Sequence, residues 1–314
     1  MTDLGRYILD EWTEEYRGGR LGRREFLRRV AVFGGGPAGA VALLATLGVT
    51  ASPGEMTAAA ASPVPRAVLA AAPVVPPDDP ALETRMVSFP GAAPGPRTVY
   101  GYLAQPKGAV RLPGVVVIHE NRGLVDHIKD VARRIAKLGY VALAPDLVSG
   151  AGGTDKVTDQ AQVSTLLGQT APEQLVSMPA AGVRYLTALP GARADRIGAT
   201  GFCFGGAVTW RLATQAPELR AAIPFYGTNP PLADVPKIRA AVLAFYGALD
   251  ARVDAGIPAM REALDRAKVV YDMMVEPGAG HAFFNDTAPS YNAAAAEDAW
   301  SKLQTWFGRY LKAA

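Results

Sequence analysis

The chain has 314 residues, of which 49% are hydrophobic and 19% are charged, so it is long enough for one large or two smaller domains. Its 32 Lys and Arg against 29 Asp and Glu give a net charge of +3, which is too even for a nucleic-acid-binding surface built from clustered basic residues. A single cysteine excludes an intramolecular disulfide and a zinc ribbon, and three histidines offer little for a His-rich metal centre. We therefore expect no metal, no cofactor and no nucleic-acid partner.

The N-terminal part has the composition of an export signal. Six arginines lie within residues 17–29, and the pair Arg23-Arg24 precedes an apolar Phe-Leu pair. No charged residue occurs in 30–54, and an alanine-rich run follows at 58–61. A basic segment, an apolar stretch and a run of small residues, in that order, are the three parts of such a signal. This arrangement resembles a twin-arginine (Tat) leader, which directs the export of folded proteins.

We predict a leader over residues 1–61 that is cleaved near Ala61, followed by an Ala/Pro-rich linker over 62–80. The implied partner is the Tat machinery, and the implied location is periplasmic or extracellular. A retained membrane anchor is the alternative, because the uncharged run is long enough to span a bilayer. In that case the leader provides the chain's membrane contact.

Glycines at 34, 36 and 39 also fit the pattern G-x-G-x-x-G of dinucleotide-binding folds. That motif needs a second strand and an acidic residue about 20 positions on, to hold the ribose. Glu55 is the acid nearest to that position, and Ala/Pro-rich sequence surrounds it. We reject a dinucleotide site here.

Residues 81–314 alternate between strand-like and helix-like patterns, which predicts a single three-layer α/β domain with a mainly parallel sheet. Strands are expected at Thr84–Phe89, Thr98–Ala104, Val115–Ile118, Tyr140–Pro145, Arg196–Gly201, Ala221–Tyr226, Ala241–Tyr246 and Val269–Val275. Helices are expected at His127–Leu138, Pro172–Leu189, Cys203–Gln215, Ile257–Lys268 and Trp300–Leu311.

The only cysteine lies in a pattern typical of catalysis. Gly201-Phe202-Cys203-Phe204-Gly205 follows a predicted strand and opens a predicted helix, which is a nucleophile elbow with cysteine in place of serine. Glycines on both sides let the backbone turn sharply, and the helix N-terminus favours a thiolate. We predict Cys203 as a nucleophile rather than a buried structural thiol.

An elbow nucleophile needs an acid and then a base further along the chain. His281 is the only histidine after Cys203, and it lies in a glycine-rich loop after a predicted strand. Asp250 comes first after the preceding strand, so we predict Asp250 as the acid that orients His281. Asp254 is the alternative, although a position before a helix also suits an N-cap.

The string His119-Glu120-Asn121-Arg122-Gly123 follows another predicted strand. In this fold that position supplies one N–H of the oxyanion hole, beside the N–H of the residue after the nucleophile. We predict backbone donors at Asn121 and Phe204, and a site role for Glu120. His119 and His127 are interpreted as structural.

Together these motifs resemble the dienelactone hydrolase family of cysteine-dependent α/β-hydrolases. The resemblance covers about residues 95–312. It is carried by HENRG at 119–123, DVARRIAKLGYVALAPDL at 130–147, GFCFGG at 201–206, YGALD at 246–250 and GAGHAFF at 278–284. It implies an α/β-hydrolase fold and a Cys203, His281 and Asp250 triad that cleaves esters or lactones through a thioester. It also implies that Glu120 gates the thiol.

Family members that act on dienelactone bind the substrate carboxylate through arginines. Residues 282–286 and the stretch around 158–165 contain none. We therefore predict a neutral small-molecule ester or lactone, in a pocket formed by Phe202, Phe283 and Phe284. Alternatives are a thioesterase or peptidase, or an exported redox-sensing or binding protein. The sequence leaves the physiological substrate and the oligomeric state open.

Overall fold

The computed structural model describes residues 1–62 and 72–312, so most of the predicted linker lies outside the described residues. Its centre is an eight-stranded sheet in the order β1-β2-β4-β3-β5-β6-β7-β8. The strands are β1 Leu82–Pro90, β2 Thr98–Pro106, β3 Leu112–Ile118, β4 Val141–Pro145, β5 Ala192–Phe202, β6 Leu219–Phe225, β7 Ala241–Gly247 and β8 Tyr271–Glu276.

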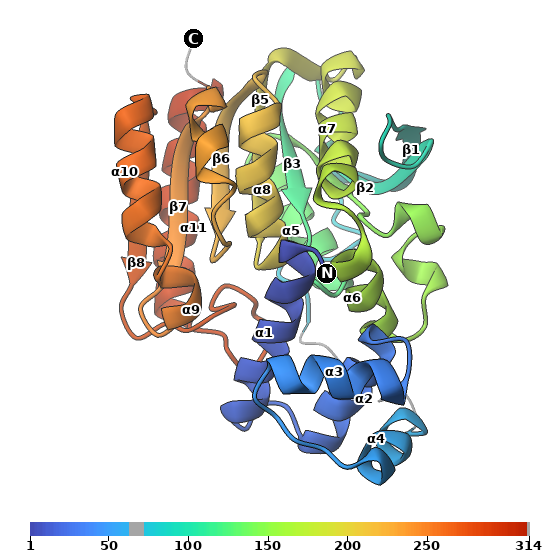
Figure 1. Cartoon of the computed structure of the whole chain (residues 1–314). Coiled ribbons are helices and arrows are strands. Elements are labelled where there is room, and N and C mark those ends of the chain that lie inside the picture. The colour runs from blue at the N-terminus through green and yellow to red at the C-terminus, as the bar shows by residue number, and fades with distance from the viewer. Residues whose placement is uncertain (63–71, 313–314) are drawn as a thin grey trace.

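Six strands, β4, β3, β5, β6, β7 and β8, run parallel to one another. At the edge of the sheet, β2 pairs with β4 in the antiparallel direction, and β1 pairs with β2 in the same way. The central strands are buried along nearly their whole length, as expected for a parallel sheet covered on both faces. Helices α7 and α8 pack on one face, while α5 and α11 pack on the other (Figure 1). This confirms the predicted three-layer architecture.

The helices of the α/β domain are α5 Asp126–Lys137, α6 Gln160–Gln169, α7 Pro172–Ala188, α8 Phe204–Gln215, α9 Ala251–Asp254, α10 Ile257–Ala267 and α11 Ala293–Phe307. The bounds of α5, α7, α8 and α10 agree with the predicted helices within one residue, whereas α11 begins earlier than predicted. Helix α5 buries Ile128, Val131 and Ile135 on one side, and the chain leaves it through Gly139 at φ +86°, a conformation that favours glycine. The helix α6 was not predicted.

Residues of the predicted leader form four helices: α1 Asp3–Arg17, α2 Arg23–Phe33, α3 Pro37–Thr46 and α4 Pro53–Ala60. They lie below the end of the sheet, with α1 reaching up beside α8 (blue in Figure 1). Tyr7, Ile8, Leu9 and Trp12 of α1 are buried in the contact. This segment is therefore packed on the α/β domain in the full chain.

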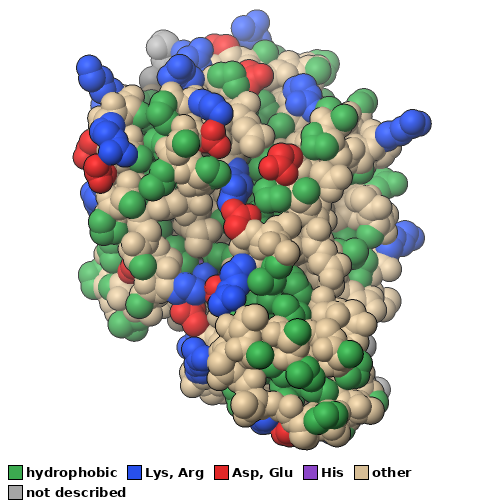
Figure 2. Space-filling view, in the orientation of Figure 1, with side chains coloured by type: hydrophobic (Ala, Val, Ile, Leu, Met, Phe, Trp, Pro, Cys, Tyr) green, Lys and Arg blue, Asp and Glu red, His purple; other side chains and the backbone are tan. Residues whose placement is uncertain are grey.

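Within residues 1–62 and 72–312, no single helix has the length and apolar composition needed to cross a membrane. Helices α2 and α3 meet that requirement only as a pair, and a bend of 109° separates them. The lower part of the molecule shows hydrophobic side chains on this face, and α3 includes the exposed Val41 (Figure 2).

Candidate active site

Cys203 occupies a sharp turn between β5 and α8. Its φ of +57° is unusual for any residue other than glycine, and its N–H donates to the Phe225 carbonyl across the neighbouring strand at 3.1 Å. A Cβ on Gly205 would lie 2.3 Å from the Ile118 carbonyl oxygen, so only glycine lets α8 approach β3 this closely. The elbow predicted from the sequence is thus present in the backbone.

His281 lies beside the elbow and contacts the predicted acid. Its Nδ1 is 2.5 Å from Oδ2 of Asp250, and this contact places the imidazole hydrogen on Nδ1 and leaves Nε2 as an acceptor. Burial opposes the charged imidazole, but the Asp250 carboxylate outweighs it and raises the pKa of His281. Burial likewise opposes ionisation of Asp250, but His281 holds the pKa of that carboxyl below its usual range.

Asp254, the alternative acid, lies in α9 and makes no hydrogen bond to His281 among the described contacts. Burial, together with the nearby Asp250 carboxylate, raises its pKa to about 6. Asp250 itself caps α9 by accepting from the Val253 N–H at 3.4 Å. The geometry therefore favours Asp250 as the partner of His281.

The loop after β3 forms one wall of the site. Glu120 is buried and accepts a hydrogen bond from the Asn285 side chain at 2.7 Å, while the Asn121 carbonyl accepts from Ser164 at 2.9 Å. The Phe204 N–H faces the sulfur of Cys203. Burial raises the pKa of the Cys203 thiol, and the carboxylates of Glu11 and Glu120 add to the effect.

The other two histidines make their contacts away from Cys203. His119 is fully buried, and its Nε2 accepts from the Leu147 N–H at 2.9 Å. His127 lies 3.1 Å from Asp286, through Nδ1. Neither lines the cavity beside Cys203.

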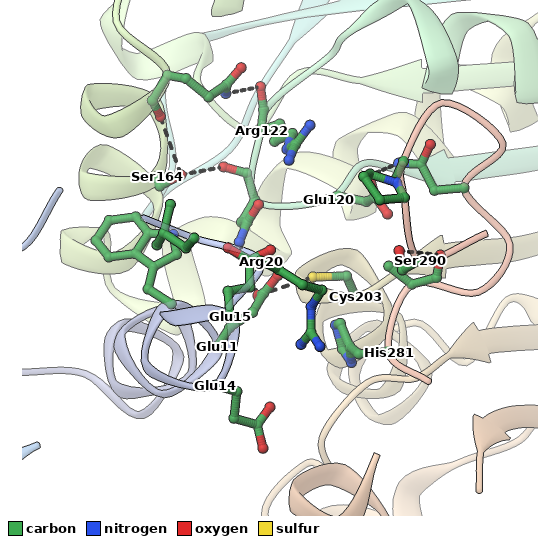
Figure 3. A pocket seen from close by; sticks show the side chains of 18 of the residues that line it. Glu11, Glu14, Glu15, Arg20, Glu120, Arg122, Ser164, Cys203, His281 and Ser290 are labelled. Carbon is green, nitrogen blue, oxygen red and sulfur yellow. Dashed lines mark hydrogen bonds between the residues drawn. The ribbon is translucent and has the colours of Figure 1, made fainter. Parts of the chain in front are cut away.

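Two side chains of α1 that the sequence did not predict reach Cys203 and His281. The thiol of Cys203 donates to Oε2 of Glu11 at 3.3 Å, and the hydroxyl of Tyr7 lies 3.5 Å from the sulfur and 3.2 Å from His281 Nε2. Figure 3 shows Glu11 pointing from α1 toward Cys203. The acid bonded to the thiol is therefore Glu11 rather than Glu120.

A sequence signal for this helix does exist. Leu4, Ile8 and Trp12 recur at a spacing of four residues, which is typical of one buried helix face, and Thr2 caps the helix by accepting from the Gly5 N–H at 2.8 Å. Nothing in that pattern specifies which part of the α/β domain the helix contacts.

A cavity of about 220 Å³ opens beside Cys203 and His281, and its lining is mostly polar. Arginines also line it: Figure 3 shows Arg20 of the N-terminal segment and Arg122 of the loop after β3. Arg29 of the N-terminal segment lines it as well. Arg29 is paired with Glu25 at 2.9 Å.

The predicted phenylalanine pocket is wrong in this structure. Phe202, Phe283 and Phe284 do not line the cavity; they are buried in an aromatic cluster around Phe225. Adjacent side chains of a strand point to opposite faces, so Phe202 at the end of β5 fills the core behind Cys203.

Glu11, Cys203 and His281 each offer an atom that could bind a metal, and these atoms lie within 4.8 Å of one another. Asp250 orients the imidazole from behind, as an acid does for many metal-binding histidines. The same atoms already satisfy one another through the thiol and the Tyr7 hydroxyl. The prediction of no metal stays a prediction.

Comparison with known proteins identifies the family to which the chain belongs. The model of the Dienelactone hydrolase family matches residues 99–311. The chain belongs to this family. A protein of Methylorubrum extorquens with the provisional name carboxymethylenebutenolidase is 38% identical over 221 residues, which cover 67% of this chain and 76% of that relative.

Solved structures agree with this assignment. A provisional dienelactone hydrolase from Klebsiella pneumoniae superposes with a TM-score of 0.67 at 32% identity, over 73% of this chain and all of that one. A dienelactone hydrolase-like promiscuous phosphotriesterase from metagenomic libraries has a TM-score of 0.64 at 30% identity, over 73% and 99%. This dienelactone hydrolase family member has the α/β-hydrolase fold and is a hydrolase that acts on ester or lactone bonds.

Proposed function

We propose that the chain cleaves carboxylic esters or lactones with Cys203 as nucleophile, His281 as general base and acid, and Asp250 as the residue that orients His281. The observation that carries the proposal is the 2.5 Å contact between His281 and Asp250 beside a cysteine at a strand-to-helix elbow. A histidine with Nδ1 held by a carboxylate presents Nε2 as a base, which is the arrangement a nucleophile requires.

In the proposed reaction His281 takes the thiol proton while the sulfur attacks the carbonyl carbon. The N–H groups of Asn121 and Phe204 hold the negative oxygen that results. The carbon–oxygen single bond then breaks, His281 returns the proton to the leaving alcohol, and a thioester remains. Water, deprotonated by His281, cleaves the thioester and releases the carboxylic acid and the thiol. In a lactone, acid and alcohol leave as one molecule.

The substrate proposal follows from the cavity. Arg122 of the α/β domain lies at the cavity wall, and this removes the argument for a strictly neutral substrate that rested on phenylalanines. Hydrolysis of matched esters with and without a free carboxylate decides which class is preferred.

Replacement of the nucleophile tests the proposal. Cys203→Ala removes the attacking sulfur, so p-nitrophenyl acetate hydrolysis should fall by at least about 10³-fold. Cys203→Ser should keep the fold and lose most activity, because its surroundings suit a thiol. Circular dichroism and melting curves check folding. Full activity in folded Cys203→Ala would refute the proposed nucleophile.

Hydrolysis rates of the purified enzyme are compared on esters, lactones, thioesters and peptides. Preference for thioesters or peptides would indicate thioesterase or peptidase action instead of the proposed function. A non-catalytic redox sensor predicts equal iodoacetamide labelling of Cys203 with and without an inhibitor that forms an acyl-enzyme, whereas the proposed enzyme should be protected.

Export through the Tat pathway is a further part of the proposal. It is supported by the twin arginines, which are exposed: Arg23 bonds Glu55 and the Thr50 carbonyl, and Arg24 bonds Ser62. Replacement of both by lysine should retain the protein in the cytoplasm. The N-terminus of the protein recovered from outside the cytoplasm then shows whether residues 1–61 are removed, and recovery of an uncleaved chain in the membrane fraction supports an anchor.

A further inference from the structure

Helix α1 occupies the space that a substrate needs. A carbonyl carbon under attack must approach the sulfur of Cys203 with its oxygen toward the loop after β3. In this structure the Glu11 carboxylate lies there: its Oε2 accepts from the thiol at 3.3 Å and from the side-chain amide of Asn121 at 2.9 Å. Cys203 is only 2% exposed as a result of this and neighbouring packing.

The other half of the catalytic pair is occupied as well. The Tyr7 hydroxyl lies between the thiol and Nε2 of His281, at 3.5 and 3.2 Å, so the base contacts Tyr7. The Arg252 guanidinium covers the Tyr7 ring at 4.6 Å from its centroid and bonds Glu14 at 3.0 Å. About two turns of α1, from Tyr7 to Glu14, are thereby fixed against the elbow and against α9.

The chemistry of Glu11 matches that of a reaction product. Hydrolysis of an ester leaves a carboxylic acid beside the nucleophile, and Glu11 places a carboxyl group in that position. The thiol in turn donates to Glu11 and stays protonated, which suppresses the reactive thiolate.

We propose that α1 is a built-in inhibitor of this hydrolase, with Glu11 as an internal mimic of the carboxylic acid product. The proposal rests on the proposed function and adds a regulatory step to it: the active state is the one in which α1 has withdrawn from the elbow. Substrate competes with α1 for the same position, and removal of residues 1–61 as a leader ends the inhibition permanently.

The docking of α1 also depends on a contact remote from the catalytic atoms. Gly5 of α1 and Gly168 of α6 meet at their backbones, and a Cβ on Gly5 would lie 2.5 Å from the Gly168 carbonyl oxygen. A side chain at position 5 therefore separates the two helices without altering a residue that touches Cys203 or His281. Gly54 in α4 provides the matched control, because a Cβ there meets nothing closer than 4.0 Å.

The first experiment compares Gly5→Leu with Gly54→Leu in the full chain. Two rates are measured: alkylation of Cys203 by iodoacetamide, and hydrolysis of p-nitrophenyl acetate. If the closed state dominates, each rate scales with the open fraction, so Gly5→Leu should raise both by about tenfold or more. Gly54→Leu should leave both within about twofold of the unaltered chain, since surface changes have small effects.

The second experiment is Glu11→Ala, which removes the product mimic but leaves the Gly5 contact in place. The inhibitor proposal predicts higher kcat/KM and faster alkylation. If Glu11 instead positions Cys203 for catalysis, kcat falls while KM changes little, and the proposal is overturned. This variant also covers the case in which Gly5→Leu does not fold, as judged by circular dichroism and gel filtration.

The outcomes separate the two proposals. Faster alkylation without hydrolysis of any ester in Gly5→Leu and Glu11→Ala supports the inhibitory helix and contradicts the hydrolase function. Full hydrolysis by the unaltered chain, with no gain in either rate in folded variants, contradicts the inhibitory helix and leaves the hydrolase function standing.

Discussion

At the scale of single residues, Asp250 determines how His281 behaves. Its carboxylate both fixes the imidazole hydrogen on Nδ1 and raises the pKa of the ring against the effect of burial. Both effects act on His281 without the thiol of Cys203. The pairing of Asp250 with His281 can therefore be tested in the enzyme without a substrate.

Asp250→Asn should lower the pKa of His281 and cut hydrolysis by roughly 10⁴-fold, the cost of a wrongly held histidine in a related triad. Two-dimensional NMR titration of the three histidines measures the pKa. Asp254→Asn is the control, because its side chain has no hydrogen bond to His281 among the described contacts, and it should change activity little. An unchanged His281 titration in Asp250→Asn would contradict the assigned pairing.

The same pair predicts a pH dependence of stability. The raised pKa of His281 gives a stabilisation that is complete below its ordinary value of 6.5 and is lost as the pH rises through the folded value. The lowered pKa of Asp250 gives a stabilisation present above 3.8 and lost as the pH falls through the folded value. The difference in unfolding free energy between the unaltered chain and Asp250→Asn should thus be largest between 3.8 and 6.5. Urea unfolding across this range measures it.

Sequence reasoning works at this scale where the chemistry imposes a local pattern. Cys203 is recognisable from two glycines and a following helix, and His281 from being the only histidine that remains. Tyr7 and Glu11 carry no such mark, because their contacts with Cys203 span 196 and 192 residues of sequence. The phenylalanines next to Cys203 and His281 were misplaced, since sequence proximity to a site does not decide which face a side chain takes.

At the scale of elements, the elbow depends on backbone contact between α8 and β3. Gly205→Ala puts a Cβ 2.3 Å from the Ile118 carbonyl and 2.5 Å from that of His119. We expect the unfolding free energy to fall by about 1–3 kcal/mol, the usual cost of overpacking a core. Gly308→Ala, where a Cβ meets nothing within 4 Å, is the control and should stay within about 0.5 kcal/mol. Equal effects of the two changes on urea unfolding would contradict the close contact.

The strands and most helices of the α/β domain are predictable because their apolar patterns are long and regular. Helix α6 escaped prediction because its sequence, QAQVSTLLGQ, lacks a clear apolar stripe and contains a glycine. Its N-cap residue, Asp159, accepts from the Ala161 N–H at 2.9 Å and is also bonded to Arg28 of α2, a contact that spans 131 residues of sequence. Context of this kind is absent from a local pattern.

At the scale of the whole molecule, one buried ion pair joins the N-terminal segment to the α/β domain. Arg28 of α2 bonds both oxygens of Asp159, at 2.8 and 3.2 Å, and both side chains are nearly inaccessible to solvent. From the composition, the six arginines of residues 17–29 were predicted to belong to an export signal. The composition could not show that one of them, Arg28, forms an ion pair with Asp159 of the α/β domain. The folded segment and the proposed leader are the same residues.

Removal of one partner leaves the other charge buried, so Arg28→Met should weaken docking of the segment by about 3–5 kcal/mol. Limited proteolysis and hydrogen exchange of residues 1–62 measure that docking. The control is Arg6→Met, which breaks a half-exposed pair with Asp10 inside α1 and should cost at most about 1 kcal/mol. A double change, Arg28→Met with Asp159→Leu, should restore part of the loss, and no recovery would contradict the pairing.

The packing of Trp12 gives the molecule an optical reporter of its own state. Trp12 is one of four tryptophans and the only one within residues 1–62. It is buried against Phe33, whose ring centroid is 6.0 Å away, and under the Arg29 guanidinium. Water that reaches the indole when α1 departs should shift its fluorescence to longer wavelength. With the other three tryptophans replaced by phenylalanine, the opening of a single helix becomes visible in real time, without any attached dye.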